Sequence, residues 1–268
     1  MAECNTVEEF LFLAQCFGGY VLGLYELLFV VAFFALAWVI WARDEGVDRW
    51  IALAGMALLV FAVYADFFIA PTARQGEAQR IFYVHVPSAW IAFFAFFLVF
   101  VFSIRYLIWR KLADDGRAYA CAEVGVLFCT LVLITGPIWA RPVWGVWWTW
   151  DARLTTSLIL WLIYVGYLML RSYLTDREQR ARFAAVLGIV GFLDVPIVHM
   201  SVKWWRTLHP GPVVMRSGGM SELPTSMHVA LWASLVAFTL VFIYFVRRRV
   251  AVGHLIDQAE SIRESRER

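Results

Sequence analysis

The chain of 268 residues is 62% hydrophobic and only 16% charged, and its mean hydropathy is +0.69. A soluble domain of this length needs far less apolar sequence, so the composition excludes an ordinary soluble single-core protein. The formal net charge of +2 gives no reason to expect a nucleic-acid partner, so the expected partners are membrane lipid, a cofactor or other proteins.

Apolar runs of membrane-spanning length follow one another along the chain. A bilayer core of about 30 Å requires roughly 20 apolar residues per helix. The first run carries Glu26, so it could also be an interfacial segment that leads into one span. The fold class predicted is an all-α polytopic membrane protein, a bundle of six core transmembrane helices plus an extra N-terminal span. The seven runs are 20–41, 50–70, 84–109, 119–139, 154–174, 183–199 and 228–246.

Basic residues between the spans indicate the orientation, because cytoplasmic connections carry an excess of Lys and Arg. One side of the predicted bundle holds fifteen of them and the other seven, with Arg105 inside a span. The loops near 71–84, 140–153 and 200–227 lie on the poorer side, so we expect them to face outward.

The spans form one predicted membrane domain at 44–249, because no Pro-, Gly- or Ser-rich linker divides them. An N-terminal extension at 1–43 precedes this domain. A tail at 250–268 follows it, and the mixed charges of the tail predict a solvated cytoplasmic helix.

The outward loop at 140–155 contains the run WGVWWTWDARL at 144–154. Trp144, Trp147 and Trp148 have the spacing that one helical turn would place on a single face, where they would form an aromatic platform with Trp150 nearby. The alternative is an interfacial aromatic belt, since Trp favours membrane surfaces generally. A belt is shared among many helix ends, whereas two outward loops hold seven of the fourteen Trp residues, which favours a ligand platform.

Two histidines are predicted on the same side as this platform. His85 lies where an outward loop enters a span, and His209 lies in another outward loop. A lone histidine in a membrane protein is more often a packing residue, but two beside an aromatic surface could hold haem iron, one on each side of the ring. His199 and His228 end spans on that side too, and their spacing alone does not exclude them.

Haem also carries two propionates, which require cationic or hydrogen-bonding partners. Arg80, Arg141 and Arg153 are outward candidates, and Lys203 and Arg206 precede His209. Asp151 closes the Trp run. It could orient Arg153 or a histidine, or form an ordinary salt bridge at a loop corner.

Four segments resemble the haem-handling WWD family, in particular its CcmC-type cytochrome c maturation proteins. They occur in order within a resemblance that covers about 50–246: RIFYVHVP at 80–87, TGPIWARPVWG at 135–145, the Trp run at 144–154, and PIVHMSVKWWRTLH at 196–209.

The resemblance implies axial ligands at His85 and His209 and a family motif at Trp144 to Asp151. It implies a protein with six spans in the bacterial inner membrane that holds haem b as transient cargo at the periplasmic face. The implied activity is transfer of haem to the chaperone CcmE, a lyase-like step unlike that of a conventional enzyme. The implied partners are CcmE, the ABC-type subunits CcmA and CcmB, and the small protein CcmD.

The departure from this family is at the front, because residues 1–43 add hydrophobic sequence that a six-span protein lacks. The stretch EFLFLAQCFGGY at 9–20 and the apolar run after it resemble CcmD, so we predict a CcmD-like fusion.

Two other functions remain open from the residues alone. An electron-transfer subunit of cytochrome b type would keep its haem, but such proteins commonly bury paired histidines within facing spans. A small-molecule permease would need polar groups at mid-membrane, and only Glu26, Arg105, Glu123 and Asp194 qualify.

Overall fold

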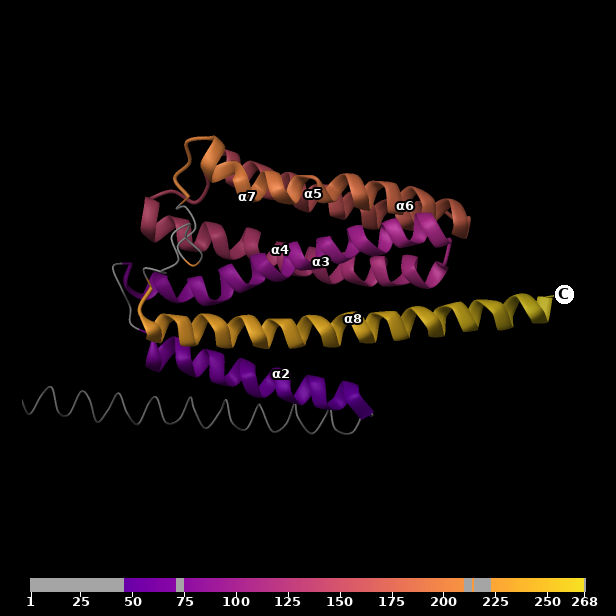
Figure 1. The fold of residues 1–268 in the computed structure, drawn as a ribbon, viewed down its shortest axis with the longest axis horizontal. Coiled ribbons are helices and arrows are strands. Elements are labelled where there is room, and N and C mark those ends of the chain that lie inside the picture. Colours follow the sequence, from indigo (N-terminus) through magenta and orange to yellow (C-terminus); the bar gives the residue numbers. More distant parts are fainter. Residues whose placement is uncertain (1–45, 71–74, 210–213, 215–222, 268) are drawn as a thin grey trace, which may run out of the picture.

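The computed structural model describes residues 46–70, 75–209, 214 and 223–267, and within these ranges it contains helices and no β-strand (Figure 1). The predicted all-α class and the six core spans are confirmed, because six helical segments are long and apolar enough to cross a membrane and each overlaps one predicted span. The additional span and the CcmD-like segment predicted in 1–43 lie outside the described residues.

Short irregularities divide several spans into two labelled elements. The segments are α2 (Gly46–Tyr64) with the π-helical η1 (Ala65–Ile69), the 3₁₀ helix η2 (Gly76–Ile81) with α3 (Phe82–Trp109), α4 (Leu112–Trp144), α5 (Ala152–Tyr173), α6 (Arg177–Phe192) with α7 (Asp194–Trp204), and α8 (Thr225–Glu267). The last helix continues far beyond the bundle, so most of the predicted tail at 250–268 is helical (Figure 1).

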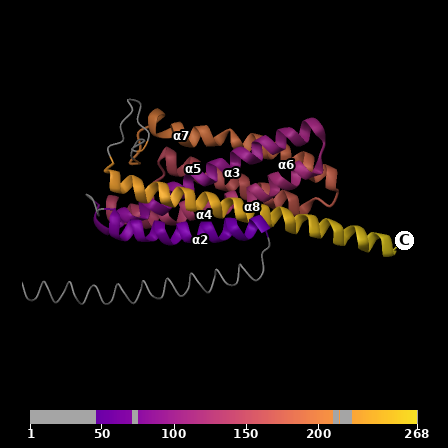
Figure 2. The ribbon, with the colours of Figure 1, turned by 60° about the horizontal axis from the view of Figure 1, so that its bottom comes forward.

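The helices α3 and α4 lie in the middle of the bundle and pack extensively on each other. On one side of them lie α5, α6 and α7, and on the other side lies α8, with α2 outside it (Figures 1 and 2). Gly125 of α4 permits the close approach, because a Cβ atom there would lie 2.8 Å from the Phe96 ring of α3. That ring stacks in turn on Tyr164 of α5 at 3.7 Å between centroids, so three helices share one tightly packed centre.

Three connections leave the bundle at the same end: the one from η1 to η2, the one from α4 to α5, and the one from α7 to α8 (Figure 1). The connections from α3 to α4 and from α5 to α6 leave at the opposite end. His85 in the first turn of α3, the Trp run between α4 and α5, and His209 after α7 therefore lie at one end of the molecule, which we call the histidine end.

Candidate functional site

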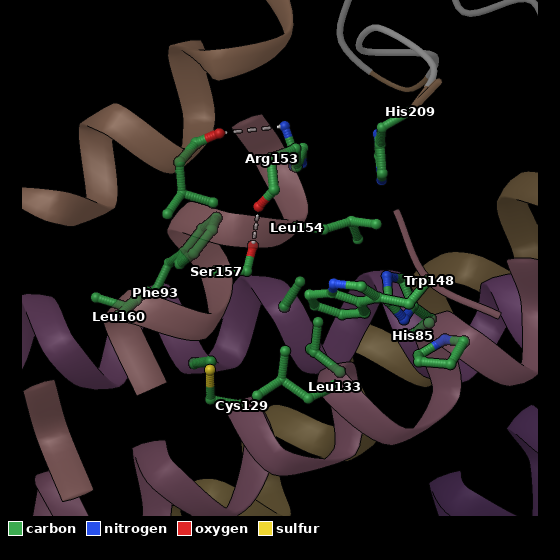
Figure 3. Close-up of a pocket in the computed structure, with 16 residues that line it drawn as sticks. His85, Phe93, Cys129, Leu133, Trp148, Arg153, Leu154, Ser157, Leu160 and His209 are labelled. Atoms are coloured by element: carbon green, nitrogen blue, oxygen red, sulfur yellow. Dashed lines mark hydrogen bonds between the residues drawn. The ribbon is translucent and has the colours of Figure 1, made fainter. Parts of the chain in front are cut away.

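A small cavity of about 50 Å³ lies at the histidine end between α3, α4, α5 and α7. His85 and His209 line it together with Trp148 and Arg153, so three separate segments of the chain meet there (Figure 3). The rest of the wall is mostly apolar and includes Phe93, Leu133, Leu160, Val198 and the thiol of Cys129. The cavity therefore combines two imidazoles and one guanidinium with a mostly apolar surface.

His85 is held by residues of α4. Its Nδ1 atom lies 2.9 Å from the Thr135 hydroxyl oxygen, and its ring meets Trp139 edge-on at 5.7 Å between centroids. Gly136 allows the imidazole to lie close, since a Cβ atom there would be 3.3 Å from Cε1 of the ring. The half-buried imidazole is thus fixed in orientation before any ligand binds.

His209 is held through a chain of hydrogen bonds that starts at Asp151. The Asp151 carboxylate caps the N-terminus of α5 by accepting from the Leu154 amide at 3.0 Å. Its other oxygen accepts from the Thr207 hydroxyl at 2.7 Å, and the Thr207 oxygen accepts from the His209 amide at 3.1 Å. The last residue of the Trp motif therefore positions the loop that carries the second histidine.

The Trp run does not form the helical turn that its spacing suggested. The helix α4 ends at Trp144, and Gly145 adopts a left-handed conformation with φ of 77°. The segment 145–151 is irregular, so Trp144, Trp147 and Trp148 do not share one helical face.

The four tryptophans of the motif therefore occupy different places. Trp148 lines the cavity, and the Trp144 ring lies edge-on to His209 at 6.3 Å between centroids. Trp147 is 58% exposed and Trp150 is 75% exposed, the latter beside Trp148. Of the four motif tryptophans, Trp148 is the one whose side chain lines the cavity.

The three arginines predicted as propionate partners also occupy different places. Arg153 lines the cavity and donates weakly to the Val198 carbonyl at 3.5 Å. Arg80 bonds to Glu77 and to the backbone of Asp66, and its guanidinium covers the Phe67 ring. Arg141 caps its own helix by donating to the Gly145 carbonyl. Arg153 is the cation that the structure brings to the histidine pair.

The remaining polar candidates lie away from the cavity lining. His199 is exposed on α7, and His228 lies in the first turn of α8. Asp194 is buried at the break between α6 and α7, where one carboxylate oxygen has no hydrogen-bond partner among the described residues.

Thr135 and Thr207 were not predicted as site residues. Each is a single hydroxyl within a span or a loop, and no spacing in the sequence connects either of them to a histidine. Thr135 meets His85 only because α3 packs on α4. Thr207 meets Asp151 only because the loop after α7 folds over that residue.

Two imidazoles that line one cavity can supply the two axial nitrogens of haem iron, and a half-buried guanidinium can pair with a propionate. The apolar part of the cavity wall, which includes Phe93, Leu133 and Leu160, suits the edge of a porphyrin. The fold and the site together define a polytopic helical membrane protein with a histidine pair and an aromatic loop at one end.

Comparisons with known proteins identify the family. Residues 29–264 match the family described as CcmC, Heme exporter protein C. Heme exporter protein C of Bradyrhizobium diazoefficiens is 41% identical over 194 residues, which cover 72% of this chain and 73% of that protein. The Escherichia coli K12 protein of the same name is 35% identical over 193 residues, covering 72% and 77% respectively. The chain therefore belongs to the CcmC family.

Proposed function

We propose that this protein binds haem b as transient cargo between His85 and His209 and passes it to the haem chaperone CcmE during cytochrome c maturation. The observation that carries the proposal is the convergence of both histidines, Trp148 and Arg153 on one cavity. Membership in the heme exporter protein C family supports a role in haem handling for cytochrome c maturation.

The cavity must widen to admit haem, because about 50 Å³ is far below the several hundred Å³ of an ordinary ligand pocket. Trp148 and Leu154 line the cavity together with both histidines, and in the view of Figure 3 Leu154 lies below His209 while Trp148 overlaps His85. The indole nitrogen of Trp148 has no hydrogen-bond partner among the described residues, so moving this ring breaks no bond of that nitrogen. Displacement of Trp148 would open the space and leave its indole to cover one face of the macrocycle.

Arg153 is the residue that would pair with a propionate. Its hydrogen bond to the Val198 carbonyl is long at 3.5 Å, so a carboxylate is a better partner than the one it has. Haem would then be attached by two reversible imidazole bonds and one ion pair, which permits release to an acceptor.

Membership of the family supports a proposal for the partners and the location. We place the protein in the bacterial inner membrane with the histidine end in the periplasm, a location supported by the smaller number of basic residues in the loops at that end. CcmE would take haem there, and CcmA, CcmB and CcmD or the CcmD-like segment at 1–43 would act with this chain.

The test is the optical spectrum of the full chain purified from cells that make haem. A His85→Ala, His209→Ala double variant should lose haem affinity by more than about 100-fold, since removal of an outer-shell partner alone costs about 10–100-fold. His199→Ala is the matched control, because His199 is exposed on α7 and does not line the cavity, and it should retain haem. A double variant with an unchanged haem spectrum would refute the ligand assignment.

Addition of apo-CcmE to the haem-loaded protein separates a carrier from an electron-transfer subunit. We expect haem to move to CcmE in the wild-type mixture. Rapid reduction by a quinol without any transfer would instead support the cytochrome b type of function.

A further inference from the structure

The hydroxyl group of Thr135 makes two contacts, one of which determines the direction of the other. Its oxygen lies 2.7 Å from the carbonyl oxygen of Leu131, one turn earlier in α4, and 2.9 Å from Nδ1 of His85 in α3. A carbonyl oxygen can only accept a hydrogen bond, so the single hydroxyl proton of Thr135 is donated to Leu131. The bond to His85 must then run the other way, with the ring nitrogen donating to the hydroxyl oxygen.

This direction specifies the tautomer of the imidazole. A neutral imidazole carries one N–H, and its other nitrogen keeps a lone pair. If Nδ1–H donates to Thr135, Nε2 is the atom with the lone pair that a metal ion requires. Gly136 and Trp139 pack against the same ring, which limits its rotation away from this arrangement.

We propose that Thr135 is a positioning residue that holds His85 as the Nδ1–H tautomer and so keeps Nε2 ready to bind iron. This inference rests on the proposed function, because it assigns a role in haem ligation to a residue that touches only the ligand histidine. Thr135 is half-buried in α4 and does not line the cavity.

The chemical nature of the partner suits a protein that must release its cargo. Metal-bound histidines that donate to a carboxylate become stronger ligands, because the negative charge raises the basicity of the ring. Thr135 offers a neutral hydroxyl oxygen in place of a carboxylate, so it orients the ring with a smaller increase in basicity. Orientation without strong electronic donation favours a bond that forms readily and also breaks.

The variants that test the proposal are Thr135→Val, which keeps the shape and removes the hydroxyl, and Thr135→Ser, which keeps the hydroxyl. The first measurement uses the full chain with ¹⁵N-labelled histidine and without haem, at about pH 8, where exposed imidazoles are neutral. The chain has five histidines, and a His85→Gln variant assigns the His85 signals. We expect Nδ1–H in the wild type and in Thr135→Ser, and a mixture of tautomers in Thr135→Val.

The second measurement is the rate at which haem leaves each variant for an excess of a haem-binding acceptor protein. We expect about a tenfold faster loss from Thr135→Val, the lower end of the range for outer-shell partners, and a wild-type rate for Thr135→Ser. If Thr135→Val does not fold, Thr135→Ala replaces it in both measurements.

Three results would overturn the proposal: an Nε2–H tautomer in the wild type, an unchanged tautomer in Thr135→Val, or equal loss of haem from Thr135→Val and Thr135→Ser. The proposed function fails differently, through an unchanged haem spectrum in the double histidine variant, and the NMR result does not depend on that spectrum.

Discussion

The two ends of the bundle are held together by different kinds of contact. At the end opposite the histidines, Arg171 of α5 binds Asp115 of α4 through two hydrogen bonds of 2.6 and 2.8 Å, and its guanidinium stacks over Tyr119. At the histidine end, the Thr135 hydroxyl joins α4 to His85 of α3, and the Asp151 carboxylate holds the loop after α7 through the Thr207 hydroxyl. A buried, bidentate charge pair fixes one end, whereas single hydrogen bonds hold the two histidines at the other end. Single bonds can rearrange at smaller cost, as the proposed uptake and release of haem would require.

Removing the Arg171–Asp115 ion pair should have the largest effect on stability. Arg171→Met leaves the buried Asp115 carboxylate without its bidentate partner, which should cost about 3–5 kcal/mol of unfolding free energy. Denaturant unfolding of the purified chain measures this loss.

The matched control replaces both partners. A variant with Asp115→Leu and Arg171→Met removes both charges and should regain most of the stability. Folded Arg171→Met protein should still show the wild-type haem spectrum. A change in haem ligation would contradict the separation of the two ends.

A second prediction compares two helix caps, one at each end. Asp151 caps α5 and also holds Thr207, whereas Asp176 caps α6 by accepting from the Gln179 amide at 2.6 Å and lies at the opposite end. Replacement of either by Ala should cost about 1 kcal/mol of unfolding free energy. Asp151→Ala should in addition weaken haem binding about tenfold, because the loop that carries His209 loses its anchor. Haem titration of both variants checks this, and equal affinities would contradict the proposed role of Asp151.

The smallest effect is expected from the aromatic loop. Trp148→Leu should weaken haem binding by about 2–10-fold, the equivalent of about 0.5–1.5 kcal/mol for one aromatic contact. Trp150→Leu is the control, since Trp150 is 75% exposed and does not line the cavity. Haem dissociation rates measure both, and a larger effect at Trp150 would show that the wrong indole has been assigned to the macrocycle.

The sequence predicted the spans well because their length and apolar composition are set by the bilayer, whatever the neighbouring helices do. The placement of His85 and His209 at one end followed from counting the crossings between them. These features depend on properties of one segment at a time.

The details of the site could not be predicted in the same way. The spacing of Trp144, Trp147 and Trp148 suggested a helix, but Gly145 ends α4 at the start of the run because its left-handed conformation closes the helix. Arg80 is bound to Asp66 and Glu77. Thr135 contacts His85 only because α3 packs on α4. Such contacts join side chains from different segments and leave no periodic pattern in the sequence.

The most direct test of the central claim is the electron paramagnetic resonance spectrum of the ferric haem-loaded protein, compared with those of the single variants His85→Gly and His209→Gly. We expect a six-coordinate low-spin signal in the wild type, a high-spin signal in each variant, and recovery of the low-spin signal when free imidazole is added. A low-spin signal that survives either substitution without added imidazole would contradict ligation of one haem by this pair.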